Sequence, residues 1–283
     1  MTKPLFSKKL FSTLYLWAPI AILAPDLAAA GGFGTLVPHR AVYDVILEAA
    51  KDRSGIKGMS GRIVYEVNGN ECDGISVQYR FVTNVVTSKN QFLTDQQTST
   101  YESPDGKEFS FQTKSFVNEV ADANVQGSAR NSESGIKVSL LRPEKRELDL
   151  VKGMFVSTHL VQVIEEAKAG RHFFQKDIFD GSGKGDEVMA STSVIGNAKS
   201  FASPIKNEKT DVVSKFDGQK AWPVTISYFK HSTDKSGESL PMYEAAFLLY
   251  ENGISRKLVM TYPDYSLRAD LQELEILDKG DCK

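Results

Sequence analysis

Apolar and polar residues alternate with a period of two along most of this 283-residue chain. Ile136, Val138 and Leu140, for example, alternate with Lys137 and Ser139. This pattern buries one face of a pleated strand and leaves the other in water, as in antiparallel sheets with one wet side. The same alternation recurs in the segments 43–47, 63–67 and 273–276. The chain is therefore expected to be mainly β.

Turn signals separate the alternating segments. Asn-Gly and Asp-Gly pairs supply the positive φ angles that two-residue hairpin turns require. Such pairs occur at Asn68-Gly69, Asp105-Gly106 (after Pro104), Asp217-Gly218 and Asn252-Gly253. They predict about a dozen or more strands joined mostly by short turns, which is a long antiparallel meander.

The segment 157–169 departs from the alternation and predicts one amphipathic helix. Ser157 or Thr158 could cap its start, and Gly170 could take the left-handed conformation just past its end. Its apolar residues recur at helical spacing: Leu160, Val161 and Ile164. A single helix in a meandering sheet most simply plugs one open end or covers a concave apolar face. The alternative is a helix that docks a partner.

The N-terminal residues 1–30 have the pattern of a cleavable export signal. Three lysines precede an apolar run at 10–23, and small residues follow at 28–31. The pattern predicts cleavage between Ala30 and Gly31. A membrane anchor is disfavoured because a span needs ~20 apolar residues, and this run is shorter. The expected product is a single periplasmic β domain, 31–283, without a membrane span.

The charge pattern argues against nucleic acid as a partner. The chain has 34 basic and 36 acidic residues, and no basic tract stands out in its sequence. Phosphate binding needs clustered Lys and Arg. The sequence also lacks an evident Pro-rich or Ser-rich linker. One continuous domain is therefore favoured over two.

A glycine-rich segment, 180–185, suggests a phosphate-binding loop at first sight. A Walker loop needs Gly-x4-Gly-Lys-Ser/Thr. Here Ile178 stands at the first glycine position and Gly185 replaces the hydroxyl residue. No clear helix follows to hold phosphates. We therefore interpret the segment as a mobile hairpin loop between two strands.

Other signals for catalysis or cofactor binding are equally weak. The four histidines do not have zinc-ligand spacing, and no Gly-x-Ser-x-Gly elbow is present. They are His39, His159, His172 and His231. His159 and His172, at the ends of the predicted helix, are expected to be packed or solvated. The sequence gives no positive reason to expect an enzyme, a metal site or a cofactor.

Aromatic residues in the predicted strands could line an apolar groove for an acyl chain or a peptide. The simpler interpretation is ordinary core. The residues are Phe109, Phe111, Phe116, Phe173, Phe174, Phe179, Tyr228 and Phe229. Trp222-Pro223 predicts a strand edge or a bulge, since proline cannot donate to a ladder.

The chain contains two cysteines, Cys72 and Cys282. If the chain is exported to an oxidising compartment, each is the other's only intramolecular partner. A bond between them would tie the C-terminal end of the fold to an early hairpin.

Taken together, these segments resemble the alphaproteobacterial family of cell envelope integrity protein EipB. The resemblance is carried by LVPHRAVYDVIL (36–47), by 55–81, by MFVSTHLVQVIEEAKAGRHFFQKDIFDGS (154–182) and by the strands ending at Cys282. It implies a periplasmic protein whose strands curl into an open β-spiral or half-barrel, with one disulfide between Cys72 and Cys282. It also implies a role in envelope integrity and stress resistance, with periplasmic partners such as tetratricopeptide-repeat proteins. It assigns no catalytic residue.

Three hypotheses for function follow. The first is a non-enzymatic periplasmic protein that maintains envelope integrity by binding or scaffolding other envelope proteins. The second is a carrier of lipid or lipidated protein with an apolar groove under the helix. The third is a hydrolase with an unrecognised site.

Overall fold

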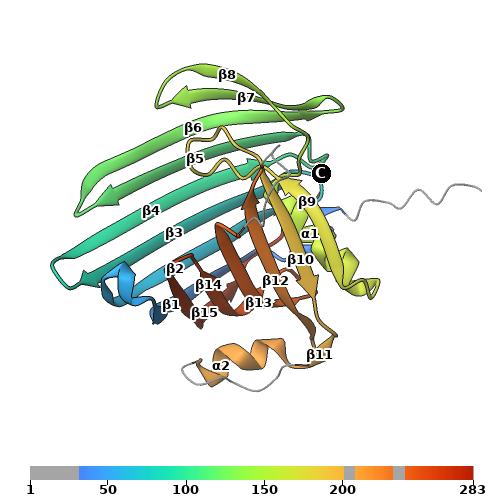
Figure 1. Cartoon of the computed structure of the whole chain (residues 1–283). Coiled ribbons are helices and arrows are strands. Elements are labelled where there is room, and N and C mark those ends of the chain that lie inside the picture. Colours follow the sequence, from blue (N-terminus) through green and yellow to red (C-terminus); the bar gives the residue numbers. More distant parts are fainter. Residues whose placement is uncertain (1–31, 201–207, 232–239, 283) are drawn as a thin grey trace, which may run out of the picture.

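The computed structural model describes residues 32–200, 208–231 and 240–282. All strands of these residues lie in one 15-stranded sheet (Figure 1). The strand order is β8-β7-β6-β5-β4-β3-β2-β1-β15-β14-β13-β12-β10-β9, with β11 beside β12. Neighbouring strands are antiparallel, and the sheet curls on itself without closing into a barrel. The expected open β-spiral is confirmed.

The bounds of the elements follow the chain. The strands are β1 (His39–Ala50), β2 (Ile56–Asn70), β3 (Gly74–Thr87), β4 (Gln91–Glu102), β5 (Glu108–Val117), β6 (Val120–Ser132), β7 (Gly135–Arg142), β8 (Arg146–Leu150), β9 (Phe173–Ile178), β10 (Met189–Ile195), β11 (Lys199–Ser200), β12 (Lys220–Lys230), β13 (Tyr243–Tyr250), β14 (Ser255–Thr261) and β15 (Tyr265–Ile276). The helices are α1 (Val156–Lys168) and α2 (Thr210–Val213), with 3-10 turns η1 (Phe33–Thr35), η2 (Asp52–Ser54) and η3 (Ser214–Phe216).

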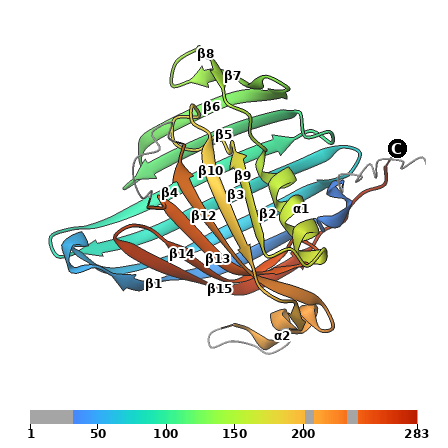
Figure 2. The same cartoon turned by 45° about the vertical axis from the view of Figure 1, so that its right-hand side comes forward.

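The first strand lies in the middle of the sheet, not at its edge. His39 of β1 is opposite Val67 of β2 on one side and Ile276 of β15 on the other. The sheet therefore has two wings, which meet at the central seam formed by the pair β1 and β15. The first wing runs from β2 to β8, and the second runs from β15 to β9. Figure 2 shows the two wings curving towards each other.

Alternation along each strand places one face inside the curl. In β1, Ala41, Tyr43 and Val45 are buried whereas Ile46 is exposed. The inward residues build three apolar clusters among the described residues. The first joins β1, β2, β13, β14 and β15, the second surrounds α1, and the third joins β5, β6 and β7.

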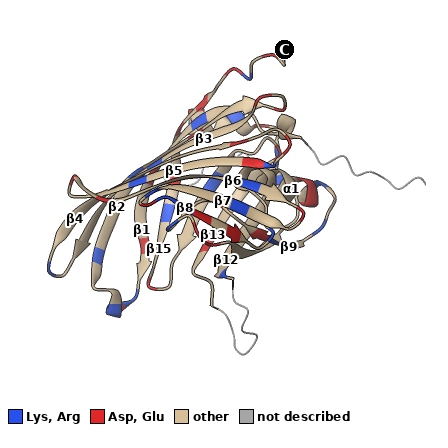
Figure 3. Cartoon of the chain, turned by 90° about the horizontal axis from the view of Figure 1, so that it is seen from above, with Lys and Arg blue, Asp and Glu red and all other residues tan. Residues whose placement is uncertain are grey.

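Charged residues of both signs are interspersed over the strands (Figure 3). Several form ion pairs between neighbouring strands, such as Arg62 with Asp44 and Arg80 with Asp95, each at 2.9 Å. Exposed pairs of this kind contribute little to stability.

Helix α1 connects the two wings and lies within the curl (Figure 1). Val161, Val163, Ile164 and Ala167 are buried in the second cluster, against residues of η1, β10 and β12. The chain of this molecule thus covers the apolar face of α1. The plug interpretation is confirmed, and Gly170 has the expected positive φ, +70°.

A buried ion pair fastens the α2 segment to the sheet. Arg256 of β14 bonds Glu208, just before α2, and both side chains are fully buried. The Arg256 Nη1 donates to the Tyr250 hydroxyl at 2.8 Å, and its guanidinium lies 5.3 Å from the Phe216 ring. The burial of α2 and η3 against the first cluster therefore depends on a charge pair held out of water.

The turn predictions were right at some positions and wrong at others. Gly106 and Gly253 occupy hairpin turns with positive φ, as expected. Asn68-Gly69, however, lies inside β2, where Gly69 is needed because a Cβ would overlap the Gly74 carbonyl of β3. Asp217-Gly218 follows η3 and does not join two strands.

Pro223 sits in an interior strand, β12, and not at an outer edge of the sheet. The expectation that Pro223 lies at a strand edge was therefore wrong for the sheet as a whole. The physical reason for it still applies at Pro223 itself, because the neighbouring strand is interrupted there. On the side of β12 that faces β10 and β11, the pairing with β10 ends at Val224 and the pairing with β11 begins at Ala221. Pro223 stands in the interruption, where no donor is needed.

Candidate functional site: the interior of the curled sheet

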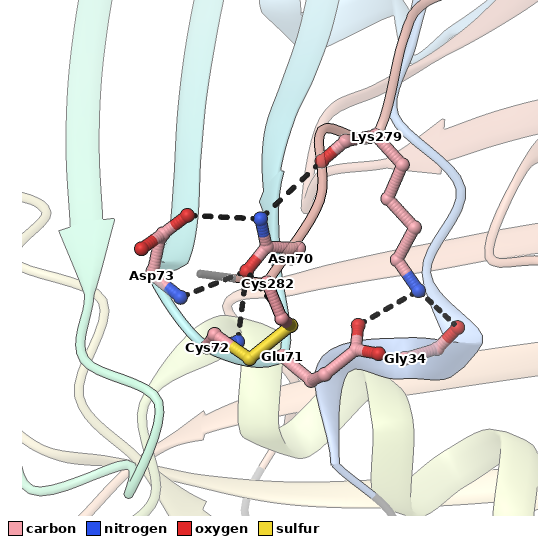
Figure 4. Close-up of a disulfide and its surroundings, with 7 residues drawn as sticks. All are labelled: Gly34, Asn70, Glu71, Cys72, Asp73, Lys279 and Cys282. Atoms are coloured by element: carbon pink, nitrogen blue, oxygen red, sulfur yellow. Dashed lines mark hydrogen bonds and ion pairs between the residues drawn. A yellow bond between two sulfur atoms is a disulfide. The ribbon is translucent and has the colours of Figure 1, made fainter.

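The disulfide predicted from the sequence joins Cys72 to Cys282 (Figure 4). Their Cα atoms are 5.7 Å apart and their sequence separation is 210. Cys72 lies in the turn between β2 and β3, and Cys282 lies after the last strand. Both residues are exposed. The bond therefore ties the C-terminal segment to the first hairpin.

Polar contacts around the disulfide extend this tie to the N-terminal side. The Asn70 side chain accepts from the Cys72 amide at 2.8 Å and donates to the Lys279 carbonyl at 3.3 Å. The Lys279 ammonium lies 2.7 Å from Glu71 and donates to the Gly34 carbonyl at 3.2 Å (Figure 4). This ammonium lowers the pKa of the Glu71 carboxyl. Because Gly34 belongs to η1, Lys279 anchors the C-terminal segment both to η1 and to the turn between β2 and β3.

A buried carboxylate from another strand caps α1. Glu102, at the end of β4, accepts from the Ser157 amide at 2.8 Å and from the Thr158 amide and hydroxyl. The first amides of a helix lack internal partners, and the helix dipole favours a negative group there. The expected caps, Ser157 and Thr158, therefore lie inside the helix, and Glu102 caps them from a distance in sequence.

The glycine-rich segment joins β9 to β10, which pair antiparallel, so the predicted hairpin loop is confirmed. It crosses from β9 to the opposite wing and packs on β5, and we call residues 179–188 the strap. A Cβ on Gly181 would overlap the Phe111 ring, and one on Gly185 would lie 2.8 Å from it. Arg146 of β8 lies 2.7 Å from Asp186 of the strap. The loop packs against the first wing, and its glycines permit this close contact with Phe111.

We expect Gly181→Ala to lower the free energy of unfolding by about 2–4 kcal/mol, since it combines a positive φ with overlap on Phe111. Gly183 is the matched control: it has a φ of +61° in the same strap, with nothing within 4 Å of an added Cβ. Gly183→Ala should therefore cost only about 1 kcal/mol. Urea denaturation of the purified protein measures both, and equal losses would contradict the packing role.

A cavity of about 220 Å³ lies between the start of α1, the strap and the inner face of the first wing. Its apolar lining consists of Leu36, Val67, Ile75, Val77, Val156 and Leu160. His39, Tyr65, Ser157, Asp180, Ser182 and Asn252 add polar groups. An apolar pocket with a few convergent polar groups is the usual form of a ligand site.

Burial shifts the pKa values of the titratable groups in this cavity towards the neutral forms. Burial lowers the pKa of His39, whose Nδ1 lies 2.7 Å from the Val37 carbonyl. Burial raises the pKa of Asp180 and raises that of Tyr65 to about 12. No lysine or arginine is among the described residues that line the cavity. The cavity therefore suits an uncharged or apolar group.

The remaining histidines behave as the sequence indicates. His159 is buried and stacks on Phe174 at 5.6 Å, and burial lowers its pKa to about 4. His172 is exposed, and its Nδ1 lies 2.8 Å from the Ile195 carbonyl. His231 lies 3.4 Å from Asp177. Among the described residues, no group of three or more His, Cys, Asp or Glu side chains could hold a metal ion.

Most of the phenylalanines considered for a groove are core. Phe109, Phe111 and Phe179 pack with Phe155 in the third cluster, with ring centroids 4.9–6.3 Å apart. The aromatic residues that face the cavity are tyrosines, Tyr65 and Tyr79. Their inward position in β2 and β3 follows from strand alternation, which is the signal that could have found them.

The predicted cleavage site, Ala30 and Gly31, lies outside the described residues. Over the described part of the chain, no helix is both long and apolar enough to cross a bilayer.

The fold and the sequence both match known proteins. A model of the EipB-like family matches residues 30–278. The chain belongs to the EipB-like family. This result confirms the resemblance drawn from the sequence segments above.

Two relatives place this EipB-like chain more closely. It is 40% identical over 273 residues to "Cell envelope integrity protein EipB" of Brucella abortus (strain 2308), covering 96% of this chain and 94% of the relative. The crystal structure of a beta-barrel-like protein of domain of unknown function DUF1849 from Brucella abortus matches with a TM-score of 0.80 and 41% identity. That match covers 86% of this chain and 99% of the other.

Proposed function

We propose that this protein maintains cell envelope integrity in the periplasm as a non-enzymatic binding protein. The name of the 40% identical relative supports the envelope role. In this protein, the bonding of the cysteines and the burial of His159 support a binding role over a catalytic one. Both cysteines are joined in a disulfide, so neither is a thiol nucleophile. His159 is neutral and packed, which makes it a poor proton shuttle.

The observation that carries the binding proposal is the open edge of β8. Of the two terminal strands of the sheet, β9 is covered at its C-terminal end, where Met154 bonds Asp177 and Phe179 through the backbone at 2.8 and 2.9 Å. Strand β8 pairs with β7 alone among the described strands. Its unpaired amides and carbonyls can accept an extended segment of another protein as a further strand. Envelope proteins, including tetratricopeptide-repeat proteins, are the candidate partners.

The test combines a phenotype with crosslinking. Cells lacking the gene are expected to be more sensitive to detergent, and the wild-type gene should restore resistance. A photocrosslinking amino acid at exposed Asp149 of β8 should capture envelope proteins in those cells. The control position is exposed Lys89, in the turn between β3 and β4. Unchanged detergent sensitivity would refute the envelope role, and equal capture at the two positions would refute the role of the edge.

A second candidate function is a carrier of lipid or lipidated protein. The observation that favours it is the apolar lining of the 220 Å³ cavity beside α1. Native mass spectrometry of protein purified from the periplasm separates the two. A co-purifying acyl-chain mass supports the carrier, whereas the mass of the protein alone, with crosslinked partners, supports the scaffold.

A further inference from the structure

A larger hollow lies farther along β3 and β4, away from α1. Its volume is about 610 Å³, within the range of about 300–1,000 Å³ that ligand pockets occupy. Tyr79 and Gln96 line both this hollow and the cavity beside α1. The hollow is therefore the outer part of one continuous concave face.

One wall of the hollow is aromatic. Tyr262 stacks on Tyr265 with ring centroids 4.8 Å apart, and Tyr243 lies 5.0 Å from Tyr262. Tyr79 and Phe81 of β3 line the hollow as well, 6.4 Å apart. Aromatic faces carry negative charge density and attract weakly positive C–H groups.

The hydroxyls of this wall lack protein partners. Within the described residues, the hydroxyls of Tyr79, Tyr262 and Tyr265 make no hydrogen bond to another residue. Burial raises the pKa of each of these hydroxyls. That of Tyr262 rises to about 12. The three hydroxyls therefore remain protonated at neutral pH and can each donate one bond to a bound molecule.

Small hydroxyl and amide side chains form the floor. Thr94 and Gln96 share the inner face of β4, beside Thr83 of β3 and Ser115 of β5. Residues two apart on a strand lie about 7 Å apart on the same face. The Thr94 hydroxyl donates to the Thr83 hydroxyl and the Ser115 hydroxyl donates to Asp122, each at 3.1 Å. The floor thus presents hydroxyl oxygens as acceptors, beside the Gln96 amide, opposite the aromatic wall.

The charges of the lining restrict the ligand. The described residues that line the hollow include Asp95 and Asp122 but no lysine or arginine. Asp95 is already paired with Arg80 at 2.9 Å. An anionic ligand would therefore meet no counter-ion. Ile56, Phe92 and Phe116 also line the hollow, but an acyl chain would cover the tyrosine hydroxyls and the Gln96 amide without replacing their bonds to water, which is unfavourable.

We propose that this hollow binds an uncharged oligosaccharide. The C–H face of a sugar ring stacks on Tyr262 and Tyr265, while the sugar hydroxyls exchange hydrogen bonds with the Tyr79 and Tyr262 hydroxyls and with the Thr94 and Gln96 side chains. This site is separate from the β8 edge and adds a small-molecule ligand to the proposed protein partner.

Isothermal titration calorimetry on the purified protein tests the site. The probes are two neutral tetrasaccharides, chitotetraose and cellotetraose, and the anionic tetragalacturonate. At least one neutral probe is expected to bind, and tetragalacturonate is expected to bind at least tenfold more weakly, about the effect of one unfavourable charge contact. A fatty acid is titrated as the apolar alternative.

Three variants locate the binding. Tyr262→Ala should weaken the binding of the neutral probe by about tenfold through lost stacking. Tyr262→Phe keeps the ring and should lose about threefold, the share of one hydrogen bond. Tyr101→Ala is the control, because exposed Tyr101 donates to the Asp73 carbonyl and does not line the hollow. It should bind like wild type.

Several results would overturn the proposal. The first is the absence of heat with either neutral probe at millimolar concentration. The second is tighter binding of tetragalacturonate or of the fatty acid than of both neutral probes. The third is wild-type affinity in Tyr262→Ala. Near-ultraviolet circular dichroism shows whether each variant keeps its fold, and Tyr262→Phe decides the outcome if Tyr262→Ala is misfolded. None of these results bears on the detergent phenotype or on crosslinking at β8.

Discussion

Replacing Cys72 with serine should lower the free energy of unfolding by about 3–5 kcal/mol. The bond closes a segment with a sequence separation of 210. Loop entropy over such a length gives about 5 kcal/mol as an upper figure, because residual structure in the denatured state reduces it. The melting temperature of a chain of this size should fall by roughly 10 °C. Differential scanning calorimetry of wild type and variant measures the shift, and proteolysis should accelerate in parallel.

The second cysteine supplies the control for this prediction. If the effect comes from the bond, Cys282→Ser and the double variant should melt at the temperature of Cys72→Ser. Wild type treated with a thiol reductant should reach the same value. The structural role of the disulfide is wrong if oxidised and reduced protein melt together.

Replacing Arg256 with methionine should lower the free energy of unfolding by about 3–5 kcal/mol, because the buried Glu208 carboxylate would lose its ion pair with the Arg256 guanidinium. Arg256 and Glu208 are both fully buried, and Arg256 also donates to the Tyr250 hydroxyl. Urea denaturation measures the loss. The exposed pair Arg130–Glu108, at 2.6 Å, is the control. Arg130→Met should change the free energy by less than about 0.5 kcal/mol.

The double variant Arg256→Met/Glu208→Leu distinguishes the charge from the contact. Apolar replacement of both partners of a buried pair is often close to neutral. We therefore expect the double variant to recover most of the stability lost in Arg256→Met. A double variant as unstable as the sum of the two single variants would show that packing around Arg256, not charge, carries the effect.

Structural features that depend on residues close together in the chain were predictable from the sequence. Alternation such as that at Ile136, Val138 and Leu140 gave the strands, and the apolar spacing of Leu160 and Ile164 gave α1. Each depends on residues within one element, so sequence neighbours carry the information. The pairing of Cys72 with Cys282 was accessible for a different reason, since no other cysteine competes.

Features that depend on distant residues were not predictable. Glu102 caps α1 from 55 positions upstream, and no local motif marks a carboxylate for that role. The glycines of the strap marked the loop but not its packing on the opposite wing, because their neighbour, Phe111, is distant in sequence. The turn at Asn118-Glu119, where two successive non-glycine residues have positive φ, carries no Asn-Gly signal.

The tyrosine wall could be found only in part. Alternation places Tyr79 on the inner face of β3, but it does not bring Tyr262 and Tyr265 opposite that strand. The curl of the whole sheet does so, and curl depends on accumulated twist and bulges, such as the register shift between Val42 and Tyr43.

The central seam between β1 and β15 has a consequence for the order of folding. The first wing can form hairpin by hairpin from nearby contacts as the chain emerges, but β1 must wait for a partner more than two hundred residues later. Until then, one edge of β1 is unpaired and can associate with other chains. Synthesis of the C-terminal strands therefore ends an aggregation-prone stage of folding.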